Sequence, residues 1–263
     1  MRLPGSNSRR SPLRTGLVAA LAAVVFTAGA AGVAASGATA PISGGPAGSG
    51  PCAAQAVSAR TGATVATIQA FANCEIARRQ TTLDALSRVV AGSAGLTSSD
   101  AAALSAEIAA DRSGLAALKA LIDNPGRPAS LRVELVQIVS GFRIYVLLGP
   151  QVRLTVAADG VVALKPHFDS ISATLADRIA RAAANGKDVG AAQAALDAMN
   201  AAVANAAALV APLPARLLAL TPAGFNGGTA QATLKSARTA ILKARDLLKA
   251  AAKDGRNVLA DLK

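Results

Sequence analysis

Apolar residues recur at alternating steps of three and four in the second half of this chain, and this spacing constrains the fold most strongly. A helix places such positions on one stripe, which must be buried against other helices. The first run is Val189, Ala192, Leu196, Met199, Val203, Ala206, Val210 and Leu213, and the second is Leu234, Ala237, Ile241, Ala244, Leu248, Ala251, Gly255, Val258 and Leu262.

Shorter stripes predict further helices in the first half of the chain. Aromatic residues make up only 2% of the sequence, and Ala in alternate layers of the stripes lets helix backbones approach closely. We therefore expect an all-α fold, an elongated Ala-rich bundle of antiparallel helical hairpins. The shorter stripes are Leu104, Ile108, Leu115, Leu118 and Ile122; Leu131, Leu135, Ile138, Phe142 and Tyr145; and Leu164, Phe168, Ile171, Leu175 and Ile179.

Capping residues mark the expected helix ends. Thr97 to Asp100 (TSSD) is typical of a capping box, in which the first side chain and the fourth satisfy each other's backbone amides. Asn185 to Asp188 (NGKD) supplies a left-handed C-cap followed by an N-cap, which favours a tight helical hairpin.

Residues 143–157 (RIYVLLGPQVRLTVA) are ambiguous between helix and strand. The stretch is rich in β-branched residues, and after Pro150 the apolar Val152, Leu154 and Val156 alternate with polar residues as in a strand. A β-hairpin turning at Gly149-Pro150 would fit locally. A lone hairpin is marginally stable in water, however. We favour two helices that meet at Pro150.

Residues 1–40 have the order of an export signal. A basic segment with four arginines precedes an apolar stretch over residues 16–35 and a small-residue run ending at Ala40. The paired Arg9-Arg10 leaves the twin-arginine and the general secretory routes both open, and an uncleaved membrane anchor is the alternative. Residues 41–51 (PISGGPAGSGP) read as a Gly/Pro/Ser linker, so we assign residues 52–263 to the helical bundle domain.

The two cysteines of an exported chain predict one disulfide, Cys52–Cys74. One continuous helix would hold them about 33 Å apart, whereas bridged Cα atoms lie within about 7 Å. The chain must turn back between them, and Arg60 to Gly62 is the natural break. An intermolecular bridge or two free thiols are the alternatives.

Few residues offer catalytic or metal-binding chemistry. His167 is the only imidazole, follows Lys165-Pro166 near a turn, and is expected to be exposed. Glu107 and Asp111 lie one helical turn apart, but Arg112 stands beside them, and we expect them to be solvated or paired. The sequence thus predicts no enzyme, no catalytic residue, no cofactor and no metal.

Positive charge gathers at the C-terminal end. Residues 1–40 hold four of the 27 basic residues and none of the 15 acidic ones, so the remainder carries +8, of which +5 lies in residues 227–263. Lys235, Lys249, Arg256 and Lys263 share one row outside the apolar stripe. This row is either a solvated helix face or a contact for an anionic polymer outside the cell or an anionic membrane surface. Nucleic acid is disfavoured, since no aromatic stacking platform accompanies the charge.

Three segments resemble a group of exported helical proteins of unassigned function from high-GC Gram-positive bacteria. They are FRIYVLLGPQVRLTVAADG (Phe142–Gly160), ANGKDV (Ala184–Val189) and LTPAGFN (Leu220–Asn226). The resemblance extends over roughly residues 80–262 and implies an all-α extracytoplasmic protein, with no activity or catalytic residue to carry over.

Two functions follow as expectations. The first is a non-enzymatic structural or interaction protein of the cell envelope, whose basic C-terminal helix contacts an anionic polymer or a protein partner. The second is an extracellular small-molecule carrier or inhibitor module, with an interhelical apolar pocket lined by Phe142, Tyr145 and Phe168.

Overall fold

The computed structural model describes residues 50–124 and 128–263, and within them every regular element is helical. The predicted all-α fold is therefore confirmed. The predicted export signal over residues 1–40 and nearly all of the linker lie outside the described residues. The elements are α2 (Ala53–Thr61), α3 (Val65–Ala91), α4 (Ser98–Asp123), α5 (Pro128–Ser140), the π-helical turn η1 (Ile144–Leu148), α6 (Gly149–Ala163), α7 (Lys165–Ala184), α8 (Gly190–Val210), α9 (Leu213–Leu218), α10 (Pro222–Asn226) and α11 (Thr229–Asp261).

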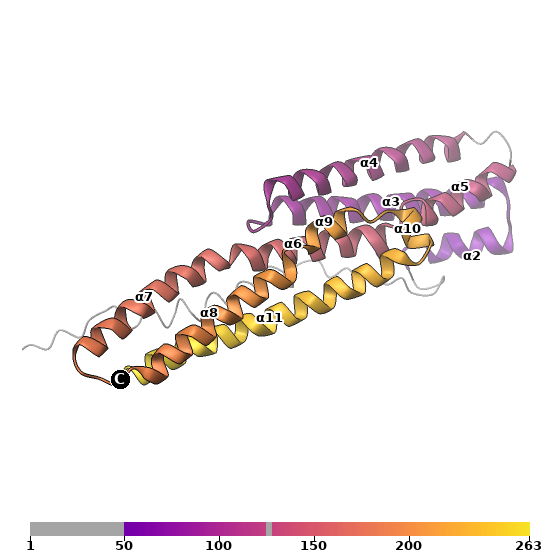
Figure 1. The fold of residues 1–263 in the computed structure, drawn as a ribbon. Coiled ribbons are helices and arrows are strands. Elements are labelled where there is room, and N and C mark those ends of the chain that lie inside the picture. The colour runs from indigo at the N-terminus through magenta and orange to yellow at the C-terminus, as the bar shows by residue number, and fades with distance from the viewer. Residues whose placement is uncertain (1–49, 125–127) are drawn as a thin grey trace, which may run out of the picture.

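The helices form a long molecule with two hydrophobic cores (Figure 1). The N-terminal core joins α3, α4, α5 and η1 to the start of α6, with Leu83 and Leu115 fully buried. The C-terminal core joins the end of α6 to α7, α8, α9 and α11. Helix α6 contributes Val152 to the first core and Ala158 to the second, so it links the two ends of the molecule.

The long apolar stripes form the C-terminal core. On α8, Ala192, Leu196, Met199 and Val203 are buried, as the spacing predicts. Helix α11 packs along α8 through Ala237, Ala244 and Ala251, each at most 1% exposed. Because these side chains end at Cβ, the two backbones can lie close together.

The disulfide Cys52–Cys74 is confirmed, with its Cα atoms 5.8 Å apart. It joins the N-cap residue of α2 to the first half of α3. The chain reverses between them: α2 ends at Thr61 with Gly62 as its C-cap, and Thr64 is the N-cap of α3. The Thr64 hydroxyl accepts from the Thr67 amide, while the Thr67 hydroxyl accepts from the Thr64 amide.

The ambiguous stretch is helical, and Pro150 stands in the first turn of α6. The helix expected to run through Tyr145 is shorter than predicted, because α5 ends at Ser140 and Arg143 takes a left-handed backbone conformation with φ of 46°. Tertiary contacts support this break: the Arg143 Nε donates to the Asn226 Oδ1 at 2.7 Å, and its guanidinium lies 5.5 Å from the centre of the Phe225 ring. Residues far along the chain thus end α5.

Candidate functional site

The outer face of α11 carries the predicted basic row. Lys235, Lys249, Arg256 and Lys263 are all exposed, and steps of seven or fourteen residues keep them on the side opposite the buried alanines. The Lys249 Nζ lies 3.1 Å from the Asp246 Oδ1, in an exposed pair that adds little stability. Leu242, at the remaining heptad position of the row, is 49% exposed.

The positive charge is least opposed over the N-terminal half of α11. No Asp or Glu stands between Asp197 and Asp246, whereas the C-terminal half of α11 includes Asp246, Asp254 and Asp261. The exposed basic residues of this acid-free stretch are Arg216 on α9 and Lys235, Arg238, Lys243 and Arg245 on α11. We call these five residues the basic surface. Their mutual field favours the approach of anions.

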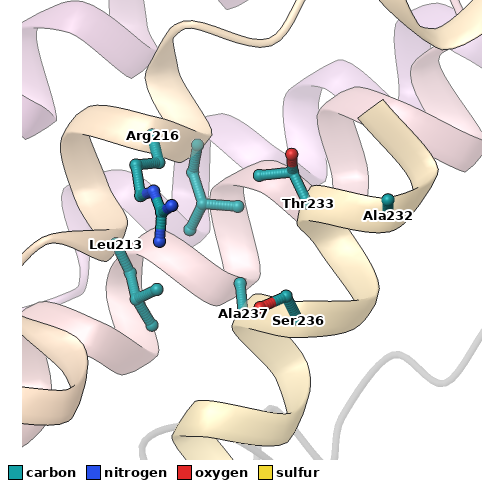
Figure 2. A pocket seen from close by; sticks show the side chains of 7 residues that line it. Leu213, Arg216, Ala232, Thr233, Ser236 and Ala237 are labelled. Atoms are coloured by element: carbon teal, nitrogen blue, oxygen red, sulfur yellow. The ribbon is translucent and has the colours of Figure 1, made fainter. Parts of the chain in front are cut away.

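A small cavity of about 180 Å³ opens between α9 and α11 (Figure 2). Its walls include the Arg216 side chain and the hydroxyl-bearing Thr233 and Ser236, and its apolar lining includes Leu213 and Ala237. Arg216 forms no ion pair with any acid in the described part of the chain. A guanidinium beside two hydroxyls offers donors suited to a phosphate or carboxylate group.

The C-terminus of α11 is tied to the hairpin between α7 and α8. The Lys187 Nζ donates to the backbone oxygens of Leu262 and Lys263, each at 3.1 Å. Gly186 has a φ of 75°, the left-handed conformation that the hairpin prediction required. The charge of Lys187 therefore holds the end of α11, as a cation does at a helix C-terminus.

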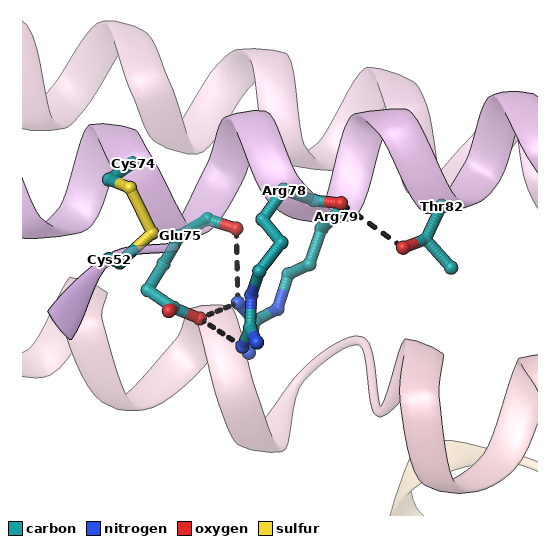
Figure 3. Close-up of polar contacts among 6 residues, drawn as sticks. All are labelled: Cys52, Cys74, Glu75, Arg78, Arg79 and Thr82. Atoms are coloured by element: carbon teal, nitrogen blue, oxygen red, sulfur yellow. Dashed lines mark hydrogen bonds and ion pairs between the residues drawn. A yellow bond between two sulfur atoms is a disulfide. The ribbon is translucent and has the colours of Figure 1, made fainter. Parts of the chain in front are cut away.

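Two arginines of α3, Arg78 and Arg79, lie near the disulfide beside Glu75 (Figure 3). Both also contact Tyr145 of η1. The guanidinium groups of Arg78 and Arg79 both donate to the Glu75 carboxylate, and their centres lie 4.7 and 5.2 Å from the centre of the Tyr145 ring. Arg79 is only 4% exposed. Through burial and cation–π contact, this cluster stabilises the packing of η1 against α3. No local sequence pattern indicates this cluster, because nothing near Tyr145 in the chain marks it as a partner of the two arginines.

Contrary to expectation, Glu107 and Asp111 are neither fully exposed to solvent nor paired with the neighbouring Arg112. The Arg112 guanidinium instead lies 2.5 Å from the Asp84 carboxylate on α3. Glu107 and Asp111 are partly buried; burial chiefly, with the nearby Asp111 charge, raises the pKa of Glu107 to about 7, and burial raises that of Asp111 to about 6. One feature of the sequence indicates this burial: Asp111 occupies the position of the apolar stripe between the buried Ile108 and Leu115.

The three aromatic residues expected to line one apolar pocket do not lie together in one core. Phe168 is 2% exposed and belongs to the C-terminal core, whereas Phe142 packs on the N-terminal core. Tyr145 lies under the two arginines. The arrangement of these residues therefore does not support the alternative function, a small-molecule carrier or inhibitor module with an apolar pocket.

Catalytic and metal-binding groups are sparse in the described residues. His167 is exposed in the first turn of α7. Across residues 50–124 and 128–263, no three His, Cys, Asp or Glu side chains gather in a way that could hold a metal ion. One helical stretch in the described residues, Gly190–Leu218, is long and apolar enough to cross a membrane. It is weak evidence for a membrane span, because a helix packed in a hydrophobic core, as α8 is, meets the same criteria.

No known protein family, curated protein or solved structure matches this chain.

Proposed function

We propose that this chain is an exported, non-enzymatic interaction protein of the cell envelope, in which a bundle of antiparallel helical hairpins presents α11 to an anionic polymer. The basic surface and the outer row of α11 would contact phosphate or carboxylate groups of that polymer. The cavity beside Arg216 would receive one such group.

The acid-free stretch between Asp197 and Asp246 is the observation that carries this proposal. Random placement of charges on a solvated surface mixes acids with bases, as the C-terminal half of α11 does. Here five exposed basic side chains on two packed helices face solvent with no acid among the residues between those two aspartates. Such a surface attracts polyanions through many weak, salt-screened contacts.

The binding test is co-sedimentation of the full chain with purified cell-wall fragments over increasing salt. Binding should weaken steeply as salt rises, since counterions screen and compete with the contacts. Lys235→Glu plus Arg238→Glu should weaken binding about tenfold or more at low salt. Lys249→Glu plus Arg256→Glu should weaken it less, because acids already flank those positions.

Arg60→Glu plus Arg132→Glu is the matched control, because both residues are exposed on the N-terminal helices and the net charge changes equally. This control should bind nearly as well as the parent chain. Equal losses in the control and the α11 variants, or binding that ignores salt, would contradict the proposal.

Export needs its own measurement. Fractionation of producing cells into medium, wall and membrane, with sequencing of the mature N-terminus, should find cleavage near Ala35 to Ala40. An intact N-terminus in the membrane fraction would instead identify the apolar segment as an anchor.

A further inference from the structure

A line of polar side chains runs between α4 and α6, inside the otherwise apolar N-terminal half of the molecule. We call it the polar seam. Three of its members stand one turn apart on α6, and Gln151 and Thr155 are fully buried while Asp159 is 5% exposed. The members are Asp100, Glu107 and Asp111 on α4, and Gln151, Thr155 and Asp159 on α6.

Hydrogen bonds cross the seam near both ends. The Gln151 Nε2 donates to the Glu107 Oε2 at 2.9 Å. The Thr97 amide, at the start of α4, donates to the Asp159 Oδ2 at 2.9 Å. Asp159 thereby takes the place that the capping box predicted for Asp100, and burial, helped by the negative charge of the nearby Asp100, raises the pKa of Asp159.

The middle of the seam lacks hydrogen-bond partners. The Gln151 Oε1 and the Thr155 Oγ1 are both buried without a partner. An unsatisfied buried polar atom destabilises the folded state, because it loses its hydrogen bonds to water without replacing them. A protonated carboxyl group is a donor, whereas an ionised one is not, so protonation of Glu107 brings a donor into a region that lacks one.

Charged groups on the elements packed around the seam do not neutralise it. On α3, Arg78 and Arg79 bind Glu75, and Asp84 binds Arg112 of α4. On α7, Lys165 binds Asp169. The other charged or titratable groups of the neighbouring elements form no ion pair with a seam carboxylate: Arg88 on α3, Lys119 on α4, Arg132 and Glu134 on α5, Tyr145 on η1, Arg153 on α6, His167, Asp177, Arg178 and Arg181 on α7, Asp197 on α8, Arg216 on α9, and the lysines, arginines and aspartates of α11.

We propose that the polar seam is a pH-sensitive contact, closed while its carboxyl groups hold protons and loosened when they ionise. Ionisation of Glu107, Asp111 and Asp159 would place three negative charges along a partly buried interface, where no described cation forms an ion pair with them. The hairpin of α3 and α4 would then separate from α6, and core residues such as Leu104 and Ile108 would become accessible. This inference is independent of the polyanion contact.

The direction of the pH effect follows from the pKa values. Burial raises the pKa of Glu107 to about 7 and that of Asp111 to about 6, and burial also raises the pKa of Asp159. In the unfolded chain these groups lose their protons near pH 4. Between about pH 4 and pH 7 the folded chain therefore binds more protons than the unfolded one, and stability falls as pH rises through that window.

Hydrogen exchange on the full, disulfide-bonded chain tests the proposal directly. Protection factors, corrected for the intrinsic pH dependence of exchange, are compared at pH 5 and pH 8 at constant ionic strength. Amides of α4 and α6 should lose protection about tenfold or more, the change that one unit of pKa shift produces. Amides at the centre of α8 and α11 should change much less.

Thermal unfolding of matched variants provides the second measurement. The Tm of the parent chain should fall between pH 5 and pH 8. Glu107→Gln plus Asp111→Asn, which removes both ionisations with little change of shape, should lose most of this fall and equal or exceed the parent's Tm at pH 8. Asp177→Asn plus Asp197→Asn removes two exposed acids and should keep the parent's pH dependence.

Two results would overturn the inference. One is equal protection of α4 and α6 in the parent chain at pH 5 and pH 8, a result that needs no variant to fold. The other is an unchanged fall of Tm in the Glu107→Gln plus Asp111→Asn variant.

Discussion

Two glycines meet where the turn after α3 passes α6. A Cβ built on Gly95 would lie 3.0 Å from the Gly160 Cα, tighter than nearly all real Cβ contacts, so the backbone of α6 would have to shift. Gly160 has open space where its own Cβ would be. The close approach of the turn helps to bring the Thr97 amide to Asp159, so a missing side chain at residue 95 supports one end of the polar seam.

We predict opposite effects for alanine at these two glycines. Gly95→Ala should destabilise the chain by about 1–3 kcal/mol, because the packed backbone of α6 would have to shift to make room for the added methyl. Gly160→Ala should be neutral or stabilise it by up to about 1 kcal/mol, through better helix propensity. Urea unfolding at constant m-value measures both changes. A Gly95→Ala chain as stable as the parent would contradict the argument.

The pairing of α8 with α11 depends on small side chains. Ala192 and Ala206 on α8, with Ala244 and Ala251 on α11, are fully buried. Each of these helices also has an exposed face, and that of α11 bears the basic residues. The same helix therefore buries alanine and displays charge, because its stripe is narrow.

Enlarging a buried alanine should separate these helices. Ala251→Leu should lower stability by about 1–3 kcal/mol, since extra methylenes in a packed core force neighbouring side chains or backbones apart. Ala250→Leu, one residue earlier and exposed, should change it by less than about 0.5 kcal/mol. Calorimetric unfolding of both chains tests the pair, and a similar loss in each would show that packing is not the cause.

Helix α6 makes the two cores depend on each other. Val152 packs in the N-terminal core, and Ala158 and Val161 pack in the C-terminal core on the same rigid helix. A change that frees α6 at one end therefore removes part of the surface that supports the other end. The α6 side of the polar seam, from Gln151 to Asp159, spans the part of this helix where one core gives way to the other.

We expect unfolding in one cooperative transition. The chain has one Tyr and no Trp, so the fluorescence of Tyr145 reports on the N-terminal half while circular dichroism reports on all helices. Leu83→Ala, at a fully buried position, should cost about 2–5 kcal/mol and shift both signals together. Leu242→Ala, at an exposed position, should shift neither appreciably. Separate midpoints for the two signals would show that the cores unfold independently.

Helical periodicity and capping residues were enough to predict the all-α fold from the sequence, together with most buried stripes and the turn that allows Cys52 to reach Cys74. These features are encoded locally, because each depends on residues that lie within a few helical turns of one another in the sequence. The exposed row of Lys235, Lys249, Arg256 and Lys263 was predictable for the same reason, since a heptad step keeps residues on one side of a helix.

Only the tertiary structure decided where helices end against distant residues and which charges meet. Arg143 breaks the expected helix by contacting Asn226 and Phe225, and Arg112 reaches Asp84 across the α3–α4 pair instead of pairing with its neighbours. Asp159 lies 62 residues from the Thr97 amide that it binds. The energy of a buried charge depends on the partners and solvent that packing leaves around it, and local spacing contains neither.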